Sequence, residues 1–140
     1  MNFYMIDTVE QMDLALIHET LSRTYWAKNI PFSVLEKGLN NSLCFGVMNA
    51  EHQQVGFARM ITDRATFAYL ADVFILPDYQ GLGLSKRLMK AILAHKELQG
   101  LRRMVLATSD AHGLYEQFGF NQLANPNSFM EIWQPNVYEN

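Results

Sequence analysis

Apolar positions along the chain follow two different spacings, and each spacing predicts one kind of element. Continuous or alternating apolar runs are typical of β-strands. Such runs occur at residues 3–6, 43–48, 55–62, 66–76, 104–108 and 129–133. Apolar residues that recur every three or four positions predict helices instead. This spacing covers residues 12–24, 34–39, 82–95 and 111–118.

Polar residues between these runs indicate where the elements begin and end. Asp7 or Thr8 is the expected N-cap of the first helix, and Ser33 that of the second. Short polar side chains in these positions accept hydrogen bonds from free helix amides. Gly119 is a suitable C-terminal stop for the last helix.

The predicted elements follow the order β-α-α-β-β-β-α-β-α-β, and a further short strand at residues 121–123 is left open. Strands interleaved with helices in this way predict a mixed central sheet with helices on both faces, an α/β or α+β architecture. The 140 residues contain no linker, repeat or low-complexity tract. We therefore expect a single domain over residues 1–140.

Composition argues against several kinds of partner. The sequence is 49% hydrophobic and 18% charged, as in globular domains, and its formal net charge is −3. Scattered Lys and Arg residues argue against binding to nucleic acid or to an anionic membrane surface. No apolar run approaches the length of a membrane span, and the first residues lack a signal-peptide pattern. We expect neither nucleic acid nor a membrane as a partner.

Cysteine and histidine usage narrows the chemistry. Cys44 is the single cysteine, which excludes an internal disulfide and favours a cytoplasmic location. No base lies near Cys44 in sequence, so a buried, inert thiol is favoured over a nucleophile. No second histidine or cysteine lies at metal-ligand spacing around His112, so no metal site is predicted.

The stretch of residues 73–89 changes from strand spacing to helix spacing across a glycine turn. Pro77 ends the apolar run, because proline has no N–H to donate to a sheet. Gly81 and Gly83 follow, and helical spacing begins directly after them. The first amides of a helix lack partners and carry partial positive charge, and glycines let a bulky anion approach them. The turn therefore predicts a phosphate-binding site.

Two common nucleotide-binding motifs do not fit this turn. The phosphate loop of NTPases is absent from the sequence, and the dinucleotide fingerprint would require a third glycine at Lys86. The turn resembles instead the acetyl-CoA loop of the GNAT superfamily of N-acetyltransferases, which reads Arg/Gln-x-x-Gly-x-Gly/Ala. The matching segment is Gln80-Gly81-Leu82-Gly83-Leu84-Ser85, in which Ser85 replaces the usual Gly or Ala.

A second GNAT signature, a tyrosine four residues before Gly-Phe, is matched by Tyr115 and Gly119-Phe120. The resemblance spans most of residues 55–120. It implies a GNAT-like sheet that splays open at a cofactor cleft, with acetyl-CoA as cosubstrate. It also implies that the backbone of the preceding strand holds the pantetheine arm and that the turn holds the pyrophosphate. The residues so implied are Val73, Phe74, Ile75, Gln80, Gly81, Leu82, Gly83, Leu84, Ser85 and Lys86.

Three residues are candidates for proton transfer. By resemblance Tyr115 is the general acid that protonates the departing thiolate; the alternative is a tyrosine packed on the sheet edge. Asp72, a carboxylate inside an apolar run, is a candidate base for the acceptor ammonium, and a structural hydrogen-bonding aspartate is its alternative. His112 lies three residues before Tyr115, hence on the same helix face, and could assist; a capping or surface histidine is its alternative.

The acceptor is the least determined part of the function. Tyr25, Trp26 and Phe32 lie between the first two predicted helices, where they either line an acceptor pocket or staple the helices together. We expect transfer of an acetyl group from acetyl-CoA to a primary amine, of a small molecule, by direct attack in a ternary complex. The alternative is a non-catalytic acyl-CoA-binding module. Whether the protein forms a homodimer is left open.

Overall fold

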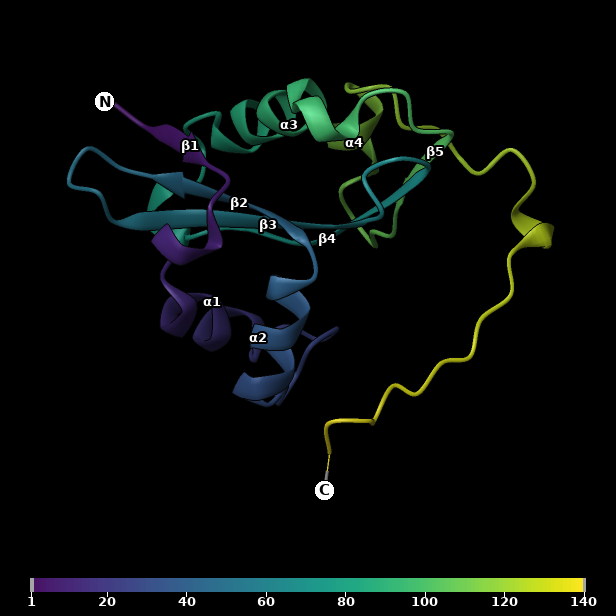
Figure 1. The fold of residues 1–140 in the computed structure, drawn as a ribbon, viewed down its shortest axis with the longest axis horizontal. Coiled ribbons are helices and arrows are strands. Elements are labelled where there is room, and N and C mark those ends of the chain that lie inside the picture. The colour runs from purple at the N-terminus through teal and green to yellow at the C-terminus, as the bar shows by residue number, and fades with distance from the viewer. Residues whose placement is uncertain (1, 140) are drawn as a thin grey trace.

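Within residues 2–139, which the computed structural model describes, the chain forms an open sheet of five strands (Figure 1). The strands are β1 (Tyr4–Ile6), β2 (Leu43–Met48), β3 (Gln54–Thr62), β4 (Phe67–Ile75) and β5 (Arg103–Leu106). They lie side by side in the order of the sequence. Neighbouring strands are antiparallel up to β4, and β5 is parallel to β4.

Helices cover both faces of the sheet, as the sequence predicts (Figure 1). The four α-helices of the described residues are α1 (Leu14–Leu21), α2 (Phe32–Asn40), α3 (Leu84–Ala94) and α4 (His112–Glu116). Helices α1 and α2 lie on one face, and α3 and α4 lie on the other. None of these helices is long and apolar enough to cross a bilayer.

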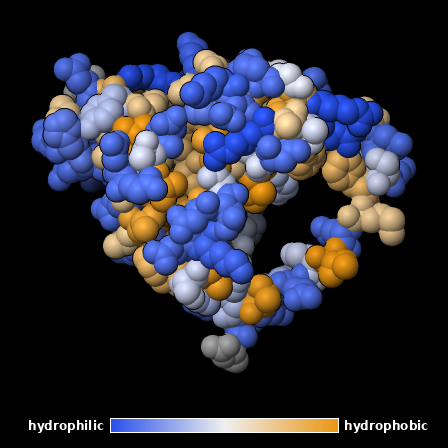
Figure 2. Space-filling model, in the orientation of Figure 1, coloured by the Kyte–Doolittle hydropathy of each residue, from blue (hydrophilic) through white to orange (hydrophobic). Residues whose placement is uncertain are grey.

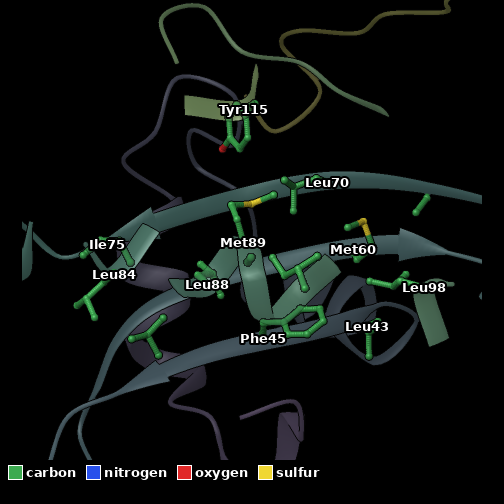
Figure 3. Close-up of a cluster of buried hydrophobic side chains, with 14 of the residues drawn as sticks. Leu43, Phe45, Met60, Leu70, Ile75, Leu84, Leu88, Met89, Leu98 and Tyr115 are labelled. Atoms are coloured by element: carbon green, nitrogen blue, oxygen red, sulfur yellow. The ribbon is translucent and has the colours of Figure 1, made fainter. Parts of the chain in front are cut away.

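Alternation along the strands divides the core into two clusters. On β2, Phe45 and Val47 pack with α3, whereas Cys44 points to the opposite side, toward α1 and α2. The α3 side is the larger cluster, and Figure 3 shows Leu88 and Met89 inside it. Both side chains are almost fully buried, and each contributes about 1.5–3 kcal/mol of hydrophobic stabilisation.

The first two helices begin at other residues than the sequence predicts. Asp13 caps α1, because its carboxylate accepts the Leu16 amide at 3.0 Å. Thr8 instead precedes a short 3₁₀ turn and makes no side-chain cap, so the expectation of a cap at Asp7 or Thr8 was wrong. Helix α2 begins earlier than expected.

Ser33 lies inside the first turn of α2 rather than at its N-cap position, so this expected cap was also wrong. Pro31 occupies that position, with a φ of −63° and extended backbone, and no side-chain hydrogen bond caps the helix. Proline disfavours helical backbone in the residue before it, so the helix does not extend back through Ile30.

The C-terminal tail differs most from the prediction. Residues 121–123 and 129–133 do not form strands; apart from a 3₁₀ turn at Pro126–Ser128, the tail is irregular. Figure 1 shows it running away from the body beyond β5. A strand needs a neighbour that supplies hydrogen-bond partners, and the tail has no such neighbour among the described residues.

Strand β4 carries an irregularity at its centre. Its residues pair regularly with β3 until Asp72 and Val73 together oppose the single residue Ala58, which defines a β-bulge. Asp72 adopts a left-handed φ of +59° at this point. Pairing of β4 with β5 covers only Phe67 to Leu70, so the strands separate beyond Leu70. The splayed sheet implied by the family resemblance is therefore present.

Candidate functional site

The separation of β4 from β5 opens a cleft of about 860 Å³. One wall is the second half of β4, another comes from α4 and the chain that follows β5, and Tyr25 and Trp26 close a further side. The cleft brings together nine of the predicted site residues: Tyr25, Trp26, Asp72, Val73, Phe74, Ile75, Gln80, Ser85 and Tyr115. The lining does not include seven others: Phe32, Gly81, Leu82, Gly83, Leu84, Lys86 and His112.

The glycine turn has the conformation that the sequence predicts. Gly81 and Gly83 have φ angles of +81° and +77°, in the left-handed region that favours glycine. A Cβ atom at either position would meet nothing within 4 Å, so the space beside the turn is open. Gly83 is the N-cap of α3, and its carbonyl accepts the Arg87 amide. The backbone N–H groups of the helix residues before Arg87 have no hydrogen-bond acceptor inside the helix.

Charge at the start of α3 is unusual for a helix. Lys86 and Arg87 occupy its first turn, which contains no acidic residue. Cations at a helix N-terminus interact unfavourably with the helix dipole, so an anion bound there would stabilise the arrangement. Arg87 already donates to the Phe3 carbonyl at 2.8 Å, whereas Lys86 is exposed.

Gln80 links the turn to the cleft wall. Its side-chain amide donates to the Ile75 carbonyl at 2.9 Å, across the Pro77–Tyr79 turn. This hydrogen bond fixes the end of β4 relative to the start of α3.

Tyr115 lies where the cleft meets the α3-side core. Its side chain is buried, and its ring packs edge-on against Phe120 with 6.0 Å between ring centroids. Figure 3 shows it at the margin of the core cluster, near Leu70. Burial, and secondarily the negative charge of Asp110, raises the pKa of the Tyr115 phenol above its ordinary value of 10.0. The shift makes the phenol a weaker acid, and the phenol is protonated at neutral pH with or without it.

Asp72 is part of a hydrogen-bonded chain that sequence reasoning did not find. Its Oδ2 accepts from Arg59 Nε and its Oδ1 accepts from Trp26 Nε1, both at 2.8 Å. Arg59 also donates to Ser42 at 3.3 Å, and its guanidinium lies beneath α2, 3.2 Å from where a Cβ on Gly38 would be. These hydrogen bonds fix Trp26 against β4.

Two of the residues predicted for catalysis or acceptor binding lie outside the cleft. His112 is exposed at the start of α4 and lines a separate, smaller cavity with Tyr115. Phe32 is 42% exposed at the start of α2, where its ring packs edge-on against His18. The packing of Phe32 corresponds to the stapling alternative, because α1 supplies His18.

Cys44 is buried on the α1–α2 side of the sheet, as predicted for an inert thiol. Burial raises the pKa of its thiol to about 12, and Arg59 opposes the shift only in part. In residues 2–139 no group of three or more His, Cys, Asp or Glu side chains could hold a metal ion.

Comparison with known proteins places the chain among acetyltransferases. Residues 41–122 match the acetyltransferase (GNAT) domain. A crystal structure of a protein from Xanthomonas campestris, described as belonging to the GNAT family, is 49% identical and covers 100% of this chain and 99% of its own, with a TM-score of 0.96.

Curated relatives are similar over part of their length. An acetyltransferase-named protein of Gibberella zeae is 38% identical over 65% of this chain and 62% of its own. The [ribosomal protein bS18]-alanine N-acetyltransferase of Haemophilus influenzae is 38% identical over 51% of each chain. The alignments span between 38% and 62% of the length of the matched curated relatives. The domain match and the full-length similarity to the Xanthomonas structure show that the chain belongs to the GNAT acetyltransferase family.

Proposed function

We propose that the protein transfers the acetyl group of acetyl-CoA to the primary amine of a small molecule, by direct transfer in a ternary complex. The observation that carries this proposal is the composition of the cleft. A single cavity reaches from the free edge of β4 and the start of α3 to a buried phenol and to an aromatic wall. These are the parts needed to hold a thioester, protonate its leaving group and bind an amine.

The turn before α3 fits the phosphates of acetyl-CoA. Open space lies beside Gly81 and Gly83, the first amides of α3 lack helix partners, and Lys86 adds positive charge. These groups suit a pyrophosphate better than a neutral ligand. The amides from Leu82 to Lys86 would hold it.

The free edge of β4 fits the pantetheine arm. From Ala71 to Ile75 the side of β4 that faces β5 has no strand partner among the described residues. Backbone groups of Val73 and Ile75 would pair with the amides of the arm, as an added strand does. The bulge turns the backbone at Val73, so its amide is the candidate donor to the oxyanion that develops on the thioester carbonyl.

Acetyl-CoA supplies the acetyl thioester, and the residues of the cleft supply the proton transfers. The amine forms a C–N bond with the acetyl carbon, and the C–S bond breaks. Tyr115 donates its proton to the departing sulfur. The acylated nitrogen then loses its extra proton, which restores the Tyr115 phenol directly or through water. The amine must first lose a proton, and Asp72, His112 or an intervening water is the candidate acceptor.

The acceptor site is formed by Tyr25 and Trp26. Their rings pack edge-on with 5.1 Å between centroids, and both are exposed to the cleft. Aromatic faces beside the Asp72 carboxylate favour a cationic amine with an apolar or aromatic body. The relation to the Haemophilus enzyme gives a second candidate, the N-terminal amine of a protein.

The test measures free CoA thiol with acetyl-CoA and a panel of small amines, with N-terminal alanine peptides in parallel. Cys44 is buried and adds little thiol background. Amine-dependent thiol release with small amines supports the proposal. Release only with peptides assigns the second candidate. Acetyl-CoA binding without release across the panel identifies a non-catalytic acyl-CoA-binding module.

A further inference from the structure

Charge is distributed unevenly in the cleft between β4 and β5. Among the described residues that line it, only Asp72 and Asp110 carry charged side chains, and no Lys, Arg or His contributes to the wall. The two aspartates come from different elements, because Asp72 belongs to β4 and Asp110 lies between the end of β5 and the start of α4. A cleft lined by charges of one sign concentrates ligands of the opposite sign.

The charge of Asp72 is already compensated by a residue outside the cleft lining. Arg59 donates from Nε to Asp72 Oδ2 at 2.8 Å, and the Asp72 side chain in this ion pair is only 8% exposed. Trp26 Nε1 donates to the other oxygen. A buried carboxylate with a cation beside it and a hydrogen bond on each oxygen has little attraction left for a ligand.

Asp110 has no such partner. The residue is exposed, and none of the ion pairs within residues 2–139 includes it. It does not cap α4 either, because Ala111 occupies the N-cap position and no side chain caps this helix. The Ala111 amide donates instead to Thr108 Oγ1 at 3.1 Å. The carboxylate of Asp110 is therefore available to a ligand in the cleft.

Asp110 also lies close to the candidate acid. Its negative charge contributes to the raised pKa of the Tyr115 phenol, so the two groups are within electrostatic reach of each other. Tyr25 and Trp26 line the same cavity. Within the described chain no residue after Tyr115 lines it, and Figure 2 shows open space between the C-terminal tail and the body. The tail therefore leaves this cleft open to a solute.

We propose that Asp110 binds the ammonium group of the acceptor and restricts the acceptor to amines without a carboxylate or phosphate beside the amino group. An ammonium between Asp110 and the aromatic rings gains attraction from the carboxylate and a cation–π contact from the rings. An anionic group next to the amine would instead be repelled by Asp110, and the described cleft wall offers no cation to hold it. The inference rests on the proposed function and names its acceptor class. Asp110 acts in binding, before the amine loses its proton.

A matched pair of acceptors tests this selectivity. Phenethylamine and phenylalanine share an aromatic body and a primary amine and differ by one carboxylate. The wild-type chain should prefer phenethylamine in kcat/KM, and Asp110→Asn should reduce this preference at least about tenfold, mainly by raising the KM of phenethylamine. Asp110→Glu keeps the charge and should retain most of the preference.

Glu116→Gln is the matched control for Asp110→Asn. It removes one negative charge from an exposed position on α4, a few residues away and outside the cleft lining. Far-UV circular dichroism checks that each variant keeps the fold. An unchanged preference in Asp110→Asn, or an equal change in Glu116→Gln, overturns the proposal.

Calorimetry with phenethyltrimethylammonium tests the site without catalysis. This cation keeps the aromatic body, but its quaternary nitrogen cannot be acetylated. With CoA present, we expect saturable binding to the wild-type chain, a dissociation constant raised at least about tenfold in Asp110→Asn, and no change in Glu116→Gln. This result without turnover of any amine would remove acetyl transfer and leave Asp110 as a cation site. No binding to the wild-type chain, or binding that Asp110→Asn does not weaken, overturns the proposal.

Discussion

Tyr115 and Asp72 both line the cleft, but their acidic groups have different neighbours. The Tyr115 phenol lies against the apolar core, which raises its pKa. The Asp72 carboxylate accepts hydrogen bonds on both oxygens, from Arg59 and Trp26. The apolar setting disfavours the phenolate, so Tyr115 carries its proton at neutral pH, whereas a carboxylate that accepts hydrogen bonds on both oxygens is suited to fix its neighbours.

Tyr115→Phe removes only the hydroxyl group that we assign as the acid. We expect turnover to fall by about ten- to a thousandfold, the range for lost acid–base help, with little change in the dissociation constant of acetyl-CoA. Steady-state kinetics and calorimetry measure the two quantities. Tyr4→Phe is the control, because the Tyr4 hydroxyl bonds His52 and does not line the cleft. Turnover at the wild-type level in Tyr115→Phe would leave Tyr115 with a packing role.

The Asp72→Asn variant distinguishes two roles for Asp72, that of a general base and that of a residue that positions its neighbours. A base role predicts loss of the acidic limb in the pH profile of kcat/KM. Because both carboxylate oxygens are already bonded, we expect the limb to persist and the KM of the acceptor to rise about tenfold. Trp26→Phe keeps an aromatic ring but loses the N–H donor, so it should raise the same KM. Disappearance of the limb in Asp72→Asn would assign the base to Asp72.

At the scale of elements, the turn between β4 and α3 controls cofactor binding in our proposal. Gly83→Val introduces a β-branched side chain at a φ of +77° and fills the open space beside the helix amides. We expect the dissociation constant of acetyl-CoA to rise at least about tenfold, measured by calorimetry.

Gly100→Val is the matched control for this variant. Gly100 has a φ of +73° and open space around it, so backbone strain is comparable, but it follows α3 and does not lie in the turn before that helix. Both variants should lose stability to a similar extent, and only Gly83→Val should lose affinity. Equal affinities would remove the turn from the cofactor site.

At the scale of the whole molecule, burial of Cys44 makes the free energy of unfolding depend on pH in the alkaline range. Its thiol pKa rises from about 9 in the unfolded chain to about 12 in the folded protein. Below pH 9 both states bind the proton, and stability is unaffected. Between these values only the unfolded thiol ionises, so the free energy of unfolding falls by about 1.4 kcal/mol per pH unit, up to about 4 kcal/mol.

Urea denaturation between pH 8 and pH 10.5 (roughly the range in which an ordinary thiol ionises) measures this effect. Cys44→Ala removes the thiol, so its stability should fall less steeply with pH than that of the wild-type chain. The comparison cancels the titration of other groups. Parallel pH profiles for the two proteins would contradict the assigned burial effect.

The sequence by itself determined the features that depend on neighbouring residues. Pro77, Gly81 and Gly83 impose their backbone angles locally, so the strand, turn and helix around them could be predicted. Continuous or alternating apolar runs likewise predicted strands β2 to β5 to within about three residues. Apolar residues at every third or fourth position predicted the helices, and the order of the elements placed them on both faces. The resemblance of Tyr115 and Gly119-Phe120 to a GNAT signature identified a tyrosine that lines the cleft in the structure.

Only the tertiary structure decided the features that depend on distant partners. The bulge at Asp72 arises from pairing with β3, and that pairing brings Arg59 and Trp26 to the same carboxylate. No local sequence pattern predicts this contact, because Asp72, Arg59 and Trp26 lie in different segments of the chain. Residues 129–133 have a strand pattern but no strand in the described chain. Strand propensity is realised only where an edge supplies hydrogen bonds, and within a single copy the tail does not reach one.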